Sequence, residues 1–254
     1  MKPRSLPSQS AHSRSSAGCS PGGPGWSIAK KSAAVDLADS RKDHKPLLNL
    51  LQTIRDRRAV RDFTGEAVSP GIVYQLISAA SWAPSAMNGQ NCHFTVLTDK
   101  ALLDEISTKA KEWLLKNGPN TLQSQHFRDL LRDENFHLLY NAPVLIVISA
   151  PSQNQWATED CAVAAQNMML AATGLGLGSC WIGFAQGWLN TPEGQDLLNI
   201  SRHYRCVAPV IVGHPKAVLP PVPRKAPAIS WVGTVSHPAE KKNRKAQEMQ
   251  HASE

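Results

Sequence analysis

The sequence predicts a β-sheet covered by helices, with connections that cross over the sheet. Three observations indicate this fold. Residues 144–149 (VLIVIS) form an unbroken apolar run, which is typical of a strand buried on both faces. Stretches with helical spacing separate this run from the other apolar strands. The apolar fraction of 42% in 254 residues is enough for a sizeable core.

The first half of the chain predicts helices around one strand. Apolar residues recur with helical spacing over 47–58. Ser69 followed by Pro70 is typical of a capped helix start, and an apolar face follows it. Beyond this second helix, a strand is predicted at 93–98, and helices are predicted at 101–116 and 122–140.

The second half predicts a long helix after the apolar run. We expect Thr158 to cap this helix, with Glu159 and Asp160 favourably placed in its first turn. The helix is apolar almost all round, which predicts burial on every side, either within one chain or against a second subunit. Strands are then predicted at 179–184 and 207–213, with a short helix at 192–200 between them.

The two ends differ in composition from the middle of the chain. Residues 1–46 are rich in Ser, Pro and Gly and carry eight Lys or Arg against three Asp, which is typical of a disordered extension and also of an organelle transit peptide. Residues 240–254 predict a solvated tail, so the globular domain is expected at 47–239. That domain is nearly neutral, which argues against nucleic-acid binding by the core. A soluble, cytoplasmic protein without a membrane span is expected, unless residues 1–46 direct it to an organelle.

The five cysteines, at positions 19, 92, 161, 180 and 206, show no CxxC pair and no zinc-ligand spacing. They are therefore expected to be reduced structural thiols, and no metal site is predicted.

Three arginines after the first helix are the first candidate site. Arg57, Arg58 and Arg61 repel one another if they share a helical turn. Either they face water at a helix C-terminus, or they hold a dianion such as a phosphate through charge-assisted hydrogen bonds.

Three further segments carry candidate binding groups. The loop 83–91 offers one hydroxyl and three carboxamides, which suit the mixed donor and acceptor edge of a heterocycle but also suit an ordinary Asx-rich turn. Gly183 allows a flat ligand to approach the backbone beside Trp181, or else marks a bulge. The stiff segment 219–225 ends in the cations Arg224 and Lys225.

The order of these motifs is more informative than any one of them. Arg-Arg-x-x-Arg-x-Phe at 57–63, Ala-Pro-Ser-x-x-Asn-x-Gln at 83–90, the Ala-rich helix leading into Gly-Leu-Gly and Cys-Trp-Ile-Gly, and Val-Gly-His-Pro at 212–215 occur in sequence. Together with Pro-x-x-Pro-Arg-Lys at 220–225, they resemble the nitroreductase superfamily of flavin enzymes over roughly residues 47–232.

The resemblance implies an α+β fold, with a mixed central β-sheet flanked by helices and an intertwined homodimer that holds FMN at its interface. It implies three groups of cofactor-binding residues, and no catalytic side chain, because the flavin carries the chemistry. The phosphate and the polar edge of the flavin would be held by Arg57, Arg58, Ala59, Arg61, Arg224 and Lys225. The loop that reaches the flavin, often across the interface, would be Pro84, Ser85, Asn88 and Gln90. The backbone that faces the ring would be Ile182 and Gly183.

The implied activity is an FMN-dependent oxidoreductase that takes hydride from NADH or NADPH and reduces nitroaromatic, quinone or similar acceptors by a ping-pong mechanism. The alternatives are a reductive dehalogenase or other flavin-family relative, or a non-catalytic flavin-binding module that docks through its basic N-terminal tail.

The chain also departs from the family pattern. Ala59 stands where Ser is common, and Asn91-Cys92-His93 replaces the usual Pro-Trp after Gln90. The segment 101–140, which shapes the substrate pocket in this family, shows no recognisable pattern. A histidine there, such as His137, is expected to be structural.

Overall fold

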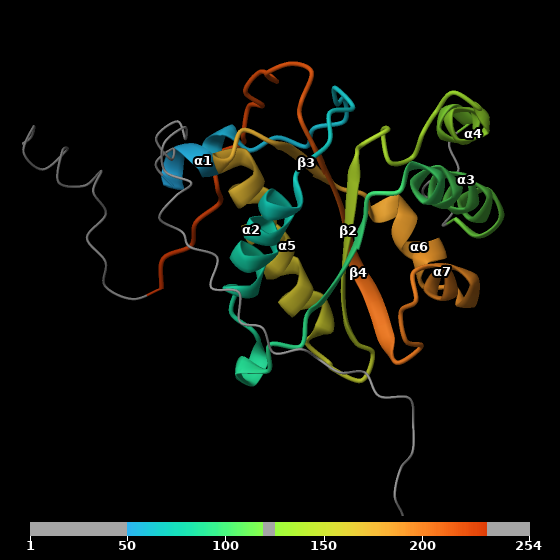
Figure 1. Ribbon diagram of the computed structural model, residues 1–254. Helices are drawn as coiled ribbons and strands as arrows, with labels where there is room; N and C mark the ends of the chain where they lie inside the picture. The colour runs from blue at the N-terminus through green and yellow to red at the C-terminus, as the bar shows by residue number, and fades with distance from the viewer. Residues whose placement is uncertain (1–49, 119–124, 233–254) are drawn as a thin grey trace, which may run out of the picture. The chain divides into compact units, whose positions relative to one another are not determined.

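The computed structural model describes residues 50–118 and 125–232, all within the compact unit Pro46–Glu254. In this unit a four-stranded sheet lies between two layers of helices (Figure 1). The strands are β1 His93–Leu97, β2 Val144–Pro151, β3 Gly178–Trp181 and β4 Tyr204–Gly213, in the spatial order β1-β2-β4-β3. The extension predicted at 1–46 and the tail predicted at 240–254 lie outside the described residues.

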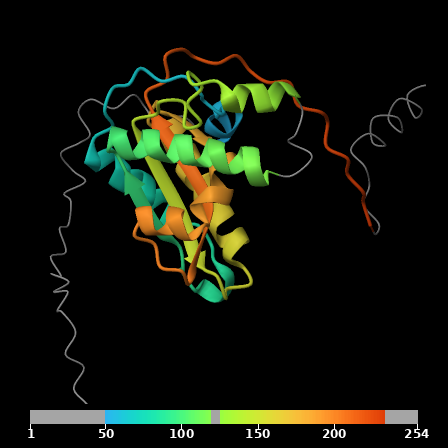
Figure 2. The same cartoon turned by 90° about the vertical axis from the view of Figure 1, so that its right-hand side faces the viewer.

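Helices cover both faces of the sheet. They are α1 Leu50–Asp56, α2 Pro70–Ser81, α3 Lys100–Asn117, α4 Gln125–Arg132, α5 Ala157–Gly174, α6 Gln186–Leu189 and α7 Pro192–Leu197. Figure 1 shows α2 and α5 on one face, and Figure 2 shows α3, α6 and α7 in front of the other. Among the described residues, no helix has the length and apolarity needed to cross a membrane.

The pairings of the four strands are antiparallel. The parallel contact among the described residues is a single bridge between Ala59 and Ser179. The mixed sheet implied by the resemblance is therefore reduced here to an antiparallel sheet with one parallel bridge, because the segment beside β3 makes too few contacts to count as a strand.

The apolar run at β2 is confirmed as a doubly buried strand. Val144, Ile146 and Ile148 belong to the core cluster beneath α2 and α5. Leu145 and Val147 belong to the cluster on the opposite face. Each of these side chains is at most 1% exposed, which stabilises the fold by about 1.5–3 kcal/mol per residue.

Helix starts follow the prediction in one case and depart from it in another. Ser69 caps α2 as expected, and its Oγ accepts the Ile72 N–H at 3.4 Å. The prediction that Thr158 caps α5 is wrong, because the helix already begins at Ala157. The start is organised by Asn154, whose Oδ1 accepts the Trp156 N–H at 2.9 Å.

α5 is not buried on every side in this single chain. Cys161, Ala164, Ala165, Met168 and Ala172 are at most 2% exposed. The opposite stripe holds Val163, which is 39% exposed, the exposed Gln166 and the half-buried Leu170. The expectation of complete burial is therefore not met by the chain alone.

Two segments fold differently from their predictions. The helix expected over 122–140 ends at Arg132, and Asp133 stops it by accepting the Asn135 N–H at 2.9 Å on its side chain. The strand expected over 179–184 ends at Trp181, because a turn over Gly183–Ala185 leads into α6, a helix that the sequence did not predict.

Candidate functional site

The segment that carries the arginines runs beside β3. The Val60 N–H donates to the Ser179 carbonyl at 3.0 Å. The Val60 side chain packs against Gly178, where an added Cβ would come within 2.7 Å of it. Farther along, the Thr64 N–H donates to the His214 carbonyl at 2.9 Å. Ala59, which forms the bridge to Ser179, therefore holds the arginines at the sheet edge where β3 begins.

A pocket of about 450 Å³ opens between this segment and the end of β3. Its lining residues are Arg61, Leu138, Tyr140, Trp181, Ile182, Gly183 and Phe184. The Ile182 N–H is already used, because it donates to the Pro209 carbonyl at 2.8 Å. Gly183 is exposed, and a Cβ added to it would meet no atom within 4 Å. A flat ligand can therefore reach the protein backbone at Gly183.

Two arginine charges bear on this pocket. The Arg61 guanidinium lies 5.9 Å from the centre of the Tyr140 ring, in a cation–π arrangement. Burial raises the pKa of the Cys180 thiol, and the charges of Arg61 and Arg57 oppose that rise. The bridge from Ala59 to Ser179 keeps the segment of Arg57 and Arg61 beside β3, and of the two only Arg61 lines the pocket.

Tyr140 enters the pocket on a strained turn that His137 holds. Tyr140 and Asn141 have φ values of 54° and 52°, in the left-handed region that such residues seldom adopt. The Nδ1 atom of His137 accepts the backbone N–H groups of Leu139 and Asn141, each at 3.2 Å. Its Nε2 atom lies 3.2 Å from Asp104 Oδ1. His137 therefore has the structural role that the sequence suggested, and it positions the ring beside Arg61.

Arg58 is used in a different way from the other two arginines. Its Nη1 donates to the carbonyls of Arg55 at 2.6 Å and Arg57 at 3.0 Å. Its Nε donates to the carbonyl of Pro220 at 2.9 Å. These bonds to backbone carbonyls attach the proline-rich segment to the end of α1, so Arg58 supports the site rather than pointing a free charge into it.

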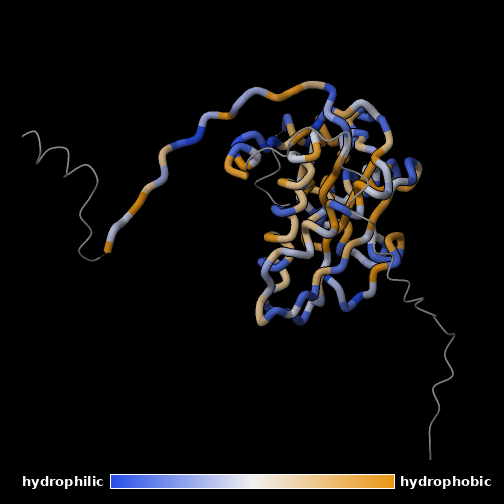
Figure 3. The backbone as a smooth tube through the Cα atoms, turned by 60° about the vertical axis from the view of Figure 1, so that its left-hand side comes forward, coloured by the Kyte–Doolittle hydropathy of each residue, from blue (hydrophilic) through white to orange (hydrophobic). Residues whose placement is uncertain are grey.

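A second attachment fixes the start of the same segment. The Lys216 ammonium lies 2.7 Å from Asp62 Oδ1, and the Lys216 N–H donates to the Asp62 carbonyl at 3.2 Å. Beyond these contacts, Arg224 and Lys225 are exposed. Figure 3 shows apolar and polar residues interspersed along this part of the chain. These contacts place the start of the segment, at Lys216, beside the arginines. Its two cations, Arg224 and Lys225, are exposed to solvent.

The amide loop lies at the opposite end of α5 from the arginines. The Ala86 N–H donates to Asp160 Oδ1 at 2.9 Å, in the first turn of α5. Ser179, which contacts the arginine segment, follows the last turn of the same helix. With 18 residues, α5 is about 27 Å long at 1.5 Å per residue. A single chain therefore does not bring Pro84, Ser85, Asn88 and Gln90 to the pocket.

The loop has a fixed internal shape. Its Ser85 hydroxyl accepts the Gln90 N–H at 2.9 Å, and the Gln90 amide donates to Asn88 Oδ1 at 3.1 Å. Met87, Asn88 and Gln90 all have left-handed φ values, between 48° and 54°. Met87 is 98% exposed. The Asx-rich turn considered from the sequence is thus present, and it projects a rigid tip away from its own chain.

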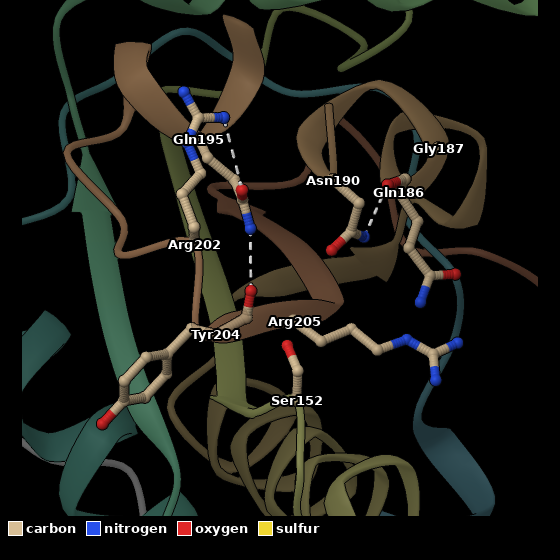
Figure 4. Close-up of a pocket in the computed structure, with 8 residues that line it drawn as sticks. All are labelled: Ser152, Gln186, Gly187, Asn190, Gln195, Arg202, Tyr204 and Arg205. Atoms are coloured by element: carbon tan, nitrogen blue, oxygen red, sulfur yellow. Dashed lines mark hydrogen bonds between the residues drawn. The ribbon is translucent and has the colours of Figure 1, made fainter. Parts of the chain in front are cut away.

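A second pocket, of about 500 Å³, lies at the other end of the sheet (Figure 4). It is lined by Ser152, Gln186, Gly187, Asn190, Gln195, Arg202, Tyr204 and Arg205. Most of its polar groups bind the protein itself. The Asn190 amide donates to the Cys206 carbonyl at 2.8 Å, and its Oδ1 accepts the Cys206 N–H at 2.9 Å. Gln195 donates to the Tyr204 carbonyl at 2.7 Å, and Arg202 pairs with Asp196 at 2.6 Å.

The sequence missed part of the first pocket. The segment that holds Trp181, Gly183 and Phe184 was a candidate from the sequence, and 101–140 was expected to shape the substrate pocket, but no pattern there indicated Leu138 or Tyr140. Tyr140 lies in a turn without periodicity, and its position depends on the side chain of His137. The second pocket was not predicted either. Its amides bind backbone groups that are distant in the sequence, and no spacing of residues indicates such contacts.

Comparisons with known proteins agree with this geometry. The profile of the nitroreductase family matches residues 54–214. The FMN reductase [NAD(P)H] of Bacillus subtilis is 27% identical over 187 residues, which cover 70% of this chain and 71% of the relative. The nitrobenzene nitroreductase of Ectopseudomonas oleovorans is 30% identical over 161 residues, which cover 50% of this chain and 70% of the relative. A nitroreductase structure with bound FMN from Bacteroides fragilis superposes with a TM-score of 0.65 at 29% identity, over 73% of this chain and 99% of that one.

Proposed function

The chain belongs to the nitroreductase family and is a flavin oxidoreductase, and from this premise we propose that it binds FMN in the pocket of Arg61 and Gly183. The proposed reaction takes hydride from NADH or NADPH and reduces a nitroaromatic, quinone or similar small acceptor by a ping-pong mechanism. Relatives named as FMN reductase and nitrobenzene nitroreductase, and a neighbour that holds FMN, support this proposal.

The observation that carries the proposal is the meeting of a cation and open backbone in one pocket. Arg61 and the exposed Gly183 both line it, and the bridge from Ala59 to Ser179 holds the arginine segment against the same strand. The volume of about 450 Å³ lies in the range of cofactor and ligand pockets. A planar ring with a negatively charged tail matches this combination.

The residues present fit FMN, and each proposed contact follows from its position. Arg57 would bind the phosphate, joined by Arg224 and Lys225 from the segment that Arg58 anchors. Arg61 would face the polar edge of the ring system. Each charge-assisted hydrogen bond of this kind contributes about 1.5–3 kcal/mol.

The remaining contacts would come from the strand and the aromatic walls. Ala59 contributes backbone only, because its methyl group replaces the hydroxyl common in the family. Gly183 would present its main chain to the ring, and Ile182, whose N–H and carbonyl already bind Pro209 and Ala185, would line the pocket beside it. Trp181 and Phe184 line the pocket beside them and would exclude water from the ring edges.

When bound, FMN supplies the two-electron hydride chemistry, and the protein supplies binding and electrostatics. Arg61, whose guanidinium lies 5.9 Å from the centre of the Tyr140 ring, would supply a positive charge that favours the reduced, more negative form of the group. We propose no residue of this protein as a general acid or base.

A second copy of the chain would complete the site. The stripe of Val163, Gln166 and Leu170 on α5 is incompletely covered, and Trp82 and Met87 are 84% and 98% exposed. The amide loop lies one helix length from its own pocket. In the proposed homodimer the partner covers these surfaces, and its Pro84, Ser85, Asn88 and Gln90 reach the ring bound by the first chain.

The test is an absorbance spectrum of the purified full chain, followed by stopped-flow reduction with NADH and with NADPH. We expect a flavin spectrum near one FMN per chain, bleaching by at least one nicotinamide, and reoxidation by a quinone or nitroaromatic. Parallel lines in double-reciprocal plots would report the ping-pong order.

Three outcomes would redirect the assignment. A protein that stays colourless after incubation with FMN would overturn the proposal. A yellow protein that no nicotinamide reduces would favour a binding module that docks through residues 1–46. A yellow protein that releases halide from haloaromatics but reduces no quinone would favour the dehalogenase alternative.

A further inference from the structure

Two cysteines that are 69 positions apart in the sequence lie side by side where the amide loop joins β1. Cys92 directly precedes β1, and Cys161 lies near the start of α5. Their Sγ atoms are 3.8 Å apart, and both are free thiols. A disulfide has an S–S distance of about 2.05 Å, so the two sulfur atoms would have to approach by a little under about 2 Å to form one.

The other described cysteines belong to a different layer. Cys161 lies in the core cluster beneath α2 and α5, with Cys92 packed against that cluster. Cys180 and Cys206 lie in the cluster on the opposite face of the sheet. The arrangement therefore pairs Cys92 with Cys161 and provides two buried cysteines as natural controls.

The two thiols have unequal environments. Cys92 is half-buried, whereas Cys161 is fully buried. The hydrogen bond between the two thiols lowers the pKa of Cys92, despite opposition from burial and from the Asp160 carboxylate. The same hydrogen bond, together with burial, raises the pKa of Cys161. Cys92 is thus the thiol that ionises first and the one that solvent reaches.

The carboxylate beside them is already occupied. Asp160 is 4% exposed and accepts the Ala86 N–H on Oδ1 at 2.9 Å and the Asn154 amide on Oδ2 at 3.1 Å. These bonds hold the amide loop and α5 together around the two sulfur atoms. The thiols therefore meet in a preorganised contact rather than by chance encounter of mobile segments.

We propose that Cys92 and Cys161 form a redox-active dithiol, which hydroperoxides convert to an intramolecular disulfide. The Cys92 thiolate attacks an oxygen of the hydroperoxide, the O–O bond breaks, an alcohol or water leaves after protonation, and Cys92 becomes a sulfenic acid. The Cys161 sulfur then attacks the Cys92 sulfur, the S–O bond breaks, and water leaves with the Cys161 proton. Two thiols and one hydroperoxide give one disulfide, one alcohol or water, and one further water.

This step does not depend on the flavin, so it is tested separately. The full chain is reduced, freed of reductant and treated with one equivalent of hydrogen peroxide. Non-reducing digestion with chymotrypsin, which can cut at Leu170 between Cys161 and Cys180, should give a linked Cys92–Cys161 peptide pair that dithiothreitol separates. The count of free thiols should fall by two per chain.

Matched variants identify the two roles. Cys180→Ser, Cys206→Ser and Cys19→Ser should keep the linked pair, whereas Cys92→Ala should lose it, and the half-buried position of Cys92 makes this variant the safer one for folding. In Cys161→Ser, dimedone should trap the Cys92 sulfenic acid at least about tenfold more than in the wild type, since an adjacent resolving thiol reacts at high effective concentration.

Two results would overturn the inference. One is a wild-type protein whose linked peptides join other cysteines, or in which no link forms while Cys92 is oxidised. The other is equal trapping of Cys92 in the wild type and in a folded Cys161→Ser variant, which would show that Cys161 does not resolve the sulfenic acid.

Discussion

The two pockets of this protein have similar volumes, about 450 and 500 Å³, and each contains arginine. They differ in what their polar groups already bind. In the pocket at the end of β3, Arg61 contacts an aromatic face and Gly183 offers open backbone. In the pocket of Figure 4, Asn190 and Gln195 bind the main chain, and Arg205 extends toward Gln186 and away from Arg202.

The two pockets therefore differ in how far their polar groups are already bound to the protein, and not in volume, and on this difference we base the proposal that the first pocket is the binding site. Asn190 pairs with both the N–H and the carbonyl of Cys206, next to the point where the register between β2 and β4 shifts. It takes the place of a strand partner on the β3 side, because the pairing of β3 with β4 ends at Trp181 and Val210. The four predictions below test this contrast, beginning with the largest expected effect.

Arg57→Ala combined with Arg61→Ala should weaken FMN binding by about 10²–10⁴-fold, because two charge-assisted hydrogen bonds of about 1.5–3 kcal/mol each are lost. The ratio of flavin absorbance to protein, and titration of the apoprotein with FMN, measure the effect. The thermal unfolding midpoint should stay near that of the wild type. The matched control is Arg202→Ala with Arg205→Ala, and equal loss of FMN in both double variants would remove the contrast between the pockets.

Asn190→Ala should lower the free energy of unfolding by about 1–3 kcal/mol, because the buried Cys206 N–H loses its side-chain partner and the Cys206 carbonyl keeps only the Gln186 amide at 3.3 Å. FMN affinity should be unchanged. Urea unfolding of the apoprotein measures the effect. Arg205→Ala, in the same pocket, should change stability by no more than about 0.5 kcal/mol. A stable Asn190→Ala variant would show that this pocket is not a structural element.

Gly183→Val should weaken FMN binding by about tenfold, or about 1.4 kcal/mol, without destabilising the protein. Its side chain would fill open space on the ligand side of the backbone. Gly187→Ala should lower the free energy of unfolding by about 1–3 kcal/mol and leave FMN binding unchanged, because the added Cβ would overlap the Trp113 ring. Fluorescence titration with FMN and thermal unfolding distinguish the two outcomes.

The smallest effect concerns pH and His137. Burial lowers its pKa in the folded protein from the usual 6.5, and the attraction of Asp104 only partly opposes this, while Lys100 and Lys111 add to the lowering. The neutral ring therefore contributes stability above about pH 6.5, and this contribution is lost as the pH falls through the folded pKa. The unfolding midpoint should drop between pH 7.5 and 5.

His137→Gln supplies the comparison for this prediction. It removes the titrating group while keeping a side-chain acceptor, so its midpoint should depend less on pH in the same range. An identical pH profile for the wild type and the variant would assign the acid sensitivity to other groups.

Local patterns predicted much of the fold. The run at 144–149 and the Ser69-Pro70 start depend on periodicity and capping, which are encoded within a few residues. The start of α5 was misassigned because Asn154, four residues upstream of Thr158, organises it instead. The helix over 122–140 was predicted too long because its apolar spacing continues past Arg132, whereas the side chain of Asp133 ends the helix by accepting the Asn135 N–H.

The candidate site was predicted less completely, for a physical reason. Its arginines and Ile182-Gly183 were recognised from motif order, and the structure brings Arg57 and Arg61 to β3. The roles of the individual residues remain predictions. The positions of Tyr140 and of the Cys92–Cys161 pair follow from contacts between distant segments, which no spacing in the sequence reveals.

The bond from Arg58 to the Pro220 carbonyl also sets a geometric limit. Arg224 lies four positions beyond that anchor, and an extended chain spans at most about 3.6 Å per residue, so the Arg224 backbone stays within about 14 Å of the anchor. The side chain at Val222 has little effect on how far Arg224 can reach, whereas the number of residues between 220 and 224 determines that distance. Inserting or deleting one residue between 220 and 224 would change the maximum distance between the Arg224 backbone and the Pro220 anchor by about 3.6 Å.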